Sequence, residues 1–136
     1  MLTRRALSFL ALLPGCSLLP TEAEQGVEVS IDSIDAQRGP EMDYVLSFSV
    51  RNSGPSAIGL SRCGDNLLPE LQRRTNGVWL NASAPVCLAI YDTSPLLLEP
   101  GETRHGRHSA RGHEVYRVLL GVYDRSNVAS PSFRIE

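Results

Sequence analysis

Lysine is absent from this 136-residue chain, so its 13 basic residues are all Arg, against 15 Asp and Glu. The net charge of −2 gives no overall attraction to nucleic acid, and we expect no nucleic-acid partner. Three Cys are too few for a small scaffold held together by many disulfides. No run of about 18 apolar residues occurs, which excludes an ordinary membrane-spanning helix. The remaining composition, 42% hydrophobic and 21% charged, is that of one ordinary globular domain.

The N-terminal residues 1–15 have the pattern of a secretory signal peptide. Arg4 and Arg5 give a positively charged start, and residues 6–13 form a short apolar stretch. A charged start, a short apolar core and small residues after it are typical of an export signal. We therefore expect an exported protein.

The end of this leader, Leu13-Pro14-Gly15-Cys16, resembles the lipobox of bacterial lipoproteins. In that family an aliphatic residue and two mostly small residues precede the Cys that receives the lipid, and Pro14 departs from the commonest choices. The resemblance implies that Cys16 becomes the lipidated N-terminus and that two or more acyl chains anchor the protein stably in a membrane. The alternative is a plain secreted protein in which Cys16 is cleaved away or free.

The residues after the lipobox imply a location and a domain boundary. Ser17 is not the Asp that retains some lipoproteins of Gram-negative bacteria in the inner membrane. The resemblance therefore favours a cell-envelope protein in the outer membrane, facing the periplasm, if the organism is Gram-negative. Residues 16–26 form the lipidated Cys and a polar tether, and residues 27–136 form the folded domain.

The folded domain shows the period-two alternation of β-strands. Val27, Val29 and Ile31 alternate with polar residues, and residues 44–50 alternate in the same way. Asn76-Gly77 predicts a tight hairpin turn, since type I′ turns require positive φ at both central residues. This turn would join two predicted strands, residues 70–74 and 78–81. Five further segments are candidate strands: 57–62, 86–91, 96–98, 115–123 and 132–136.

These segments predict an all-β fold, an antiparallel β-sandwich of seven or eight short strands. No segment shows the 3.6-residue apolar stripe of a helix, and nine Pro disfavour long helices. Residues 115–123 are apolar on both faces around 118–120, which indicates a central strand. Residues 103–109 carry little that could be buried, and we expect them to form an edge strand or partly a loop.

With Cys16 assigned to lipid, Cys63 and Cys87 remain as an even pair in an exported protein, where disulfides persist. A bond between them would close a loop of about 25 residues and stabilise the fold by roughly 3.5 kcal/mol on the chain-entropy estimate. Two free buried Cys are the alternative. A metal site is disfavoured because the pair has no Cys-x-x-Cys spacing.

Several turn and core motifs resemble those of bacterial immunoglobulin-like domains and of the related Ig-like proteinase inhibitors. They are Phe48-x-Val50-x-Asn52-Ser53-Gly54, Gly77-x-Trp79, Leu98-x-Pro100-Gly101-Glu102 and Tyr116-Arg117. The resemblance covers residues 27–136 and implies an immunoglobulin-like sandwich, with the Cys pair on either side of the Gly-x-Trp segment. Trp79 is expected in the core, with an exposed contact role as the alternative.

All three His lie in one Arg-rich stretch. This stretch is the candidate site for an anion or an acidic partner, and its residues are Arg104, His105, Arg107, His108, Arg111 and His113. The alternative is a solvated edge strand whose charges discourage aggregation. Metal binding is disfavoured, because His105 and His108 are an odd number of residues apart and would face opposite sides of a strand.

No catalytic set appears: Gly-x-Ser-x-Gly is absent, no phosphate-binding loop is present, and no cofactor is implied. The leading hypothesis is therefore a non-enzymatic binding or structural module whose partner is an envelope protein or polymer. An Ig-like proteinase inhibitor is the alternative, with residues 52–57 or 91–95 as the inhibitory loop. A metal-binding enzyme that uses the three His is a weaker alternative.

Overall fold

The structure, a computed structural model, describes residues 26–37, 43–83 and 85–136. Cys16 and the predicted leader lie outside the described residues. Within those ranges no helix is long and apolar enough to cross a membrane. The strands are β1 (Val27–Ala36), β2 (Asp43–Asn52), β3 (Ile58–Leu60), β4 (Arg62–Cys63), β5 (Asn66–Leu67), β6 (Pro69–Thr75), β7 (Val78–Ser83), β8 (Leu96–Leu98), β9 (Thr103–Arg111), β10 (Val115–Leu120), β11 (Val128–Ala129) and β12 (Phe133–Arg134).

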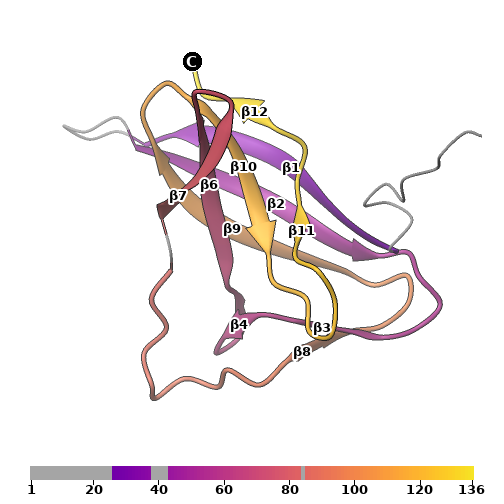
Figure 1. Ribbon diagram of the computed structural model, residues 1–136. Helices are drawn as coiled ribbons and strands as arrows, with labels where there is room; N and C mark the ends of the chain where they lie inside the picture. The colour runs from indigo at the N-terminus through magenta and orange to yellow at the C-terminus, as the bar shows by residue number, and fades with distance from the viewer. Residues whose placement is uncertain (1–25, 38–42, 84) are drawn as a thin grey trace, which may run out of the picture.

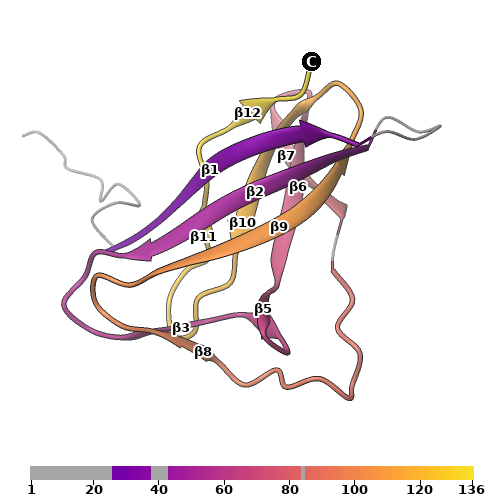
Figure 2. The same cartoon turned by 180° about the vertical axis from the view of Figure 1, so that it is seen from behind.

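The strands form two antiparallel layers. One sheet has the order β1-β2-β9, and the other has the order β11-β10-β6-β7 with β12 beside β10. Figures 1 and 2 show the first sheet crossing the second at a large angle. Two small ribbons, β3-β8 and β4-β5, lie at one end of the layers. The predicted all-β sandwich is confirmed.

Alternating side chains of the two sheets meet in one core. Leu46, Phe48 and Val50 of β2 are completely buried, and so are Val118 and Leu120 of β10. These residues recur with period two, so each strand presents one apolar face inward. Burial of large apolar side chains contributes about 1.5–3 kcal/mol each, which makes this interior the main source of stability.

The predicted hairpin and the predicted central strand are both present. Asn76 has φ 50° and Gly77 has φ 76°, as a type I′ turn requires, and they connect β6 to β7. β10 lies between β6 and β11 in its sheet, as expected of a strand that is apolar on both faces. The described chain has twelve strand segments, more than predicted, because β4, β5, β11 and β12 are two-residue pairings.

One strand prediction is wrong, and in another the first of two alternatives is confirmed. Residues 86–91 form no strand; they belong to the connection between β7 and β8 that arches away from both sheets (Figures 1 and 2). Residues 103–109 form the expected edge strand and not partly a loop, because β9 ends its sheet and pairs with β2 over its full length, Thr103–Arg111. The reason is Gly106: an added Cβ there would lie 2.3 Å from Phe48 Cζ, so the Phe48 ring fills the space that β9 leaves empty.

Trp79 does not fill the core, which corrects the prediction. It lies on β7, the terminal strand of its sheet, and is half-buried. The guanidinium carbon of Arg117 is 4.5 Å from the centre of the Trp79 ring, and that of Arg74 is 6.0 Å away. Trp79 therefore makes cation–π contacts at the sheet surface.

Two polar residues fix the ends of the first sheet. Asn52 is completely buried; its side-chain N–H group donates to the carbonyls of Ser56 and Leu98, and its oxygen accepts from the Gly54 N–H. The Tyr116 hydroxyl donates to the Arg111 carbonyl across the β9–β10 corner. A Tyr bound in this way to a carbonyl a few residues upstream is the tyrosine corner of immunoglobulin-type sandwiches.

Candidate functional site

The connection between β7 and β8 is covalently fixed near its start. Cys63 of β4 and Cys87 form a disulfide with a Cα–Cα distance of 5.6 Å. The pairing predicted from the cysteine count is present. It ties a long surface segment, residues 85–95, to the small β4-β5 ribbon, and this segment is called the contact loop below.

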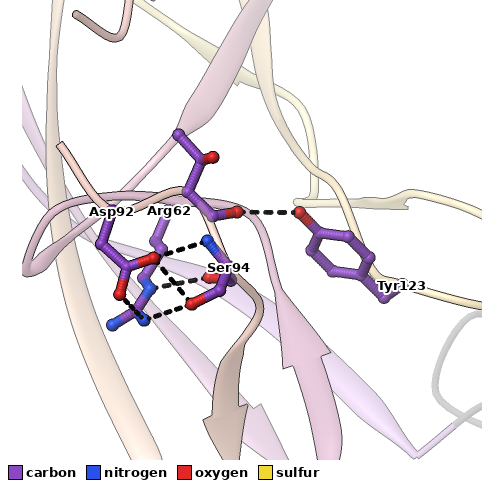
Figure 3. Close-up of polar contacts among 5 residues, drawn as sticks. Arg62, Asp92, Ser94 and Tyr123 are labelled. Atoms are coloured by element: carbon purple, nitrogen blue, oxygen red, sulfur yellow. Dashed lines mark hydrogen bonds and ion pairs between the residues drawn. The ribbon is translucent and has the colours of Figure 1, made fainter. Parts of the chain in front are cut away.

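The far end of the contact loop is fixed by a polar cluster around Arg62 (Figure 3). The Arg62 guanidinium donates to the Ser94 carbonyl at 2.7 Å, to the Ser94 hydroxyl at 2.8 Å and to the Asp92 carboxylate at 2.6 Å. Asp92 in turn accepts from the backbone N–H and the hydroxyl of Ser94. Arg62 is thus the single side chain that joins β4 to both residues of this turn.

Further bonds hold the same end. The Gly64 N–H donates to the Asp92 carbonyl at 2.9 Å, and the Tyr123 hydroxyl donates to the Thr93 carbonyl at 3.2 Å. The hydrogen bonds from Ser94, together with the charge of Arg62, hold the pKa of the Asp92 carboxyl below its usual range. The lowered pKa keeps the Asp92 carboxylate charged, and so able to accept from Arg62, to a lower pH than an ordinary Asp.

Between these two anchors the loop exposes apolar side chains. Ile90 is 83% exposed and Leu88 58%, while Tyr91 is half exposed and lies over Gly64; Val86, just before the disulfide, is 87% exposed. No charged residue occurs in residues 82–91. Single exposed apolar residues are ordinary, but a cluster of them on one fixed segment marks an interaction surface.

The His- and Arg-rich residues predicted as a site lie on β9 and its following turn, but they do not form one cluster. Arg104 and His108 share a face of the sheet with the buried side chains of β2, while His105, Arg107 and Arg111 point to the opposite face. His113 lies beyond the strand, where its ring meets Tyr44 edge-on. The alternation along β9 separates the two groups.

Carboxylates interleave with these cations. Glu102 lies 3.7 Å from Arg104, and Asp43 lies 3.0 Å from Arg111. Asp32 is 3.7 Å from His105 and also accepts from Ser49, whose hydroxyl contacts the same ring at 2.9 Å. The stretch is therefore a partly neutralised surface, and Arg107 is the member for which the described residues offer no acidic partner.

Among the described residues, no three His, Cys, Asp or Glu side chains come together as metal ligands do. The sequence also gave no sign of the cluster that holds the contact loop. No local pattern links Asp92 to its partner Arg62, which is 30 positions away in the sequence. Only the neighbouring Cys63–Cys87 pairing could have indicated that these segments meet.

No protein-family model matches the chain, and neither does any curated protein sequence. Among solved structures it is similar to a structural genomics target designated SoR45, at 16% identity over 80% of this chain and 83% of that chain, with a TM-score of 0.44. A protein described as late embryogenesis abundant is 13% identical over 86% of this chain and 72% of that chain, with a TM-score of 0.40. A β-glucosidase from Listeria innocua, solved with gluconolactone, is 12% identical with a TM-score of 0.34; the match covers 93% of this chain and 19% of that chain. Similarities of this size assign the chain to no family.

Proposed function

We propose that this protein is a lipid-anchored, non-enzymatic binding module of the bacterial cell envelope. The lipobox-like sequence before Cys16 supports the anchor and an envelope location, with the outer membrane favoured by Ser17. The immunoglobulin-like sandwich serves as the scaffold. The contact loop binds a protein partner, and this role is carried by the apolar side chains exposed between the disulfide and the Arg62 cluster.

The rigidity of the contact loop is the physical argument for binding. A flexible loop loses conformational entropy when a partner orders it, whereas a loop already fixed at Cys87 and at residues 92–94 has lost that entropy on folding. The exposed aliphatic side chains then gain free energy by leaving water for an apolar pocket. An uncharged aliphatic surface fits a protein pocket better than a hydrated envelope polymer.

Proteinase inhibition is the second candidate, and one observation favours it. Residues 91–95 are exposed and their backbone is held at Asp92 and Ser94, as a loop that enters a protease cleft requires. The other candidate segment, residues 52–57, begins at the buried Asn52. Inhibition of a protease by the purified domain at micromolar excess supports this function, and its absence across several protease classes counts against it.

The anchor is tested by mass spectrometry of the mature N-terminus and by cell fractionation. We expect acylated Cys16 and a protein that sediments with membranes. The Cys16→Ser variant should lose the lipid and leave the membrane fraction. An unmodified N-terminus on a soluble wild-type protein would contradict lipid anchoring.

The contact loop is tested by photo-crosslinking in intact cells, with a photoreactive amino acid placed at position 88 or 90. We expect crosslinked products of one defined mass from both positions. Val78 and Leu80 are the matched controls, because they are also exposed and apolar but lie on β7 outside the loop. Equal yields from the loop and from β7 would contradict a specific role of the loop.

A further inference from the structure

β9 is a nine-residue strand with one open side. It pairs with β2 and is the last strand of the β1-β2-β9 sheet. An edge strand carries a row of backbone N–H and C=O groups that can pair with another extended chain. Which residues direct these groups outward follows from the ladder.

The register of the β2–β9 pair is continuous, and Asn52 N–H donates to the Glu102 carbonyl at 3.1 Å. In an antiparallel ladder, hydrogen-bonded pairs alternate with non-bonded pairs. Counting from Asn52 and Glu102, the even-numbered residues of β9 bond to β2. The backbone groups of the odd-numbered residues therefore point to the open edge: Thr103, His105, Arg107, Ser109 and Arg111.

Two of these outward carbonyls are already occupied. The Ser109 carbonyl lies 2.7 Å from Nδ1 of His108, and the Arg111 carbonyl accepts the Tyr116 hydroxyl. Within the described chain, no hydrogen bond engages the outward backbone groups of His105 and Arg107. The C-terminal half of the edge is therefore closed by side chains, and Thr103–Arg107 stays open.

A groove lies beside this open half. Its volume is about 460 Å³, and it is lined by Asp32, Ser47, Phe48, Asn66, Leu67 and residues 105–107, with Asp32 beside His105 at its far end from Arg107 along β9. Gly106 leaves no side chain in the way, since only Phe48 occupies the space above it. The groove thus offers an apolar wall beside two unpaired backbone positions.

The charges along the edge restrict what can bind. Arg107 is exposed, its cross-strand neighbour on β2 is the neutral Ser47, and the described residues give it no ion pair. A carboxylate opposite Arg107 on an added strand gains about 0.2–1 kcal/mol, whereas a like charge is destabilising. Several registers of a second copy of β9 would bring His105, Arg107 or Arg111 opposite Arg107, which disfavours self-pairing in those registers.

We propose that the Thr103–Arg107 edge of β9 binds an extended segment of another protein by strand addition, with an acidic residue opposite Arg107. The backbone groups of His105 and Arg107 pair with the added strand. Arg107 selects for the acid, and the Leu67 side of the groove takes an apolar side chain. This proposal does not depend on the role of the contact loop, although Pro85 at the start of that loop lines a neighbouring pocket together with Arg107.

The probe is a blocked six-residue peptide of alternating Val and Thr with one central Glu, compared with the same peptide carrying Lys. Binding to the ¹⁵N-labelled domain is followed by amide chemical shifts. We expect the largest shifts at His105 and Arg107, and an affinity for the Glu peptide about 1.4- to 5-fold higher than for the Lys peptide, the range set by one cross-strand ion pair. No shifts at millimolar peptide, or shifts confined to the contact loop, would overturn the proposal.

Two variants separate the backbone from the charge. Arg107→Pro removes an outward N–H while leaving the ladder to β2 intact, because proline is tolerated on edge strands. It should abolish binding. Arg107→Ala, the matched control, should bind both peptides equally. Unchanged binding by Arg107→Pro would overturn strand addition.

Arg107→Glu should reverse the preference toward the Lys peptide, and unchanged preference would overturn the role of Arg107. Sedimentation of the wild-type domain tests whether a second copy of the chain occupies this edge instead. A dimer that Arg107→Pro dissociates would show that a second copy, not an acidic segment, fills this edge.

Discussion

Removing the Cys63–Cys87 disulfide should lower the free energy of unfolding by up to about 3.5 kcal/mol. The two Cys are 24 positions apart, so the bond closes a loop of about 25 residues. In the chain-entropy account, the bond reduces the freedom of the unfolded chain, and the loss grows with the logarithm of loop length. The Cys63→Ser/Cys87→Ser variant is the perturbation, because serine preserves size and leaves no thiol.

Urea unfolding followed by circular dichroism gives the size of the effect. For a domain of this length we expect the midpoint to fall by roughly 1–3 M, from an m-value of about 1–3 kcal/mol/M. The corresponding fall in Tm is roughly 10–20 °C. Wild-type protein unfolded in a reducing agent should match the double variant, which serves as an internal control.

The sandwich should still fold without the disulfide, because its core lies between the two sheets and not under the contact loop. The most protected core amides exchange through global unfolding, so they should all accelerate by the factor that corresponds to the loss of global stability, while residues 92–94 keep their bonds to Arg62. A loss below about 1 kcal/mol, or core amides whose exchange does not accelerate, would refute this reasoning.

Three further changes test other parts of the fold. Gly106→Ala should destabilise by about 1–3 kcal/mol through the clash with Phe48, measured by urea unfolding, and Phe48→Leu should recover part of that loss in the double variant. Asn52→Ala should cost about 2–4 kcal/mol, since it leaves the buried Leu98 carbonyl and the part-buried Ser56 carbonyl without this donor; a loss under 1 kcal/mol would contradict this role. Burial raises the pKa of Tyr116, so stability present below the pKa of the unfolded tyrosine, near about 10, should be lost as the pH rises above it. Tyr116→Phe should reduce this alkaline loss and should cost about 0.5–1.5 kcal/mol at neutral pH; an unchanged alkaline profile would contradict it.

The sequence predicted features that depend on neighbouring residues. Period-two alternation identified β1 and β2, and Asn76-Gly77 identified the hairpin, because both signals are local. The disulfide followed from having only two Cys left to pair. The fold class therefore followed from short-range patterns alone.

Features that depend on distant partners were missed or left open. Whether residues 103–109 form a full strand stayed open, because Phe48 of the next strand supplies the packing that Gly106 lacks and β9 itself shows little apolar alternation. Trp79 is apolar in sequence, but nothing local indicates that β7 ends its sheet and that Arg117 covers the ring. The Arg62–Asp92 pair joins residues 30 positions apart. All three features depend on contacts between segments that are distant in the sequence, and a local sequence pattern does not record such contacts.

The central claim, that a fixed apolar loop makes the protein contact, is tested most directly by crosslink yield at position 90 in two backgrounds. With the disulfide intact, we expect a discrete product in cells. In the Cys63→Ser/Cys87→Ser background, the yield should fall several-fold at equal protein abundance, because the loop is no longer pre-organised. An unchanged yield without the disulfide, or no product at position 90 in the wild type, would contradict the proposed role of the loop.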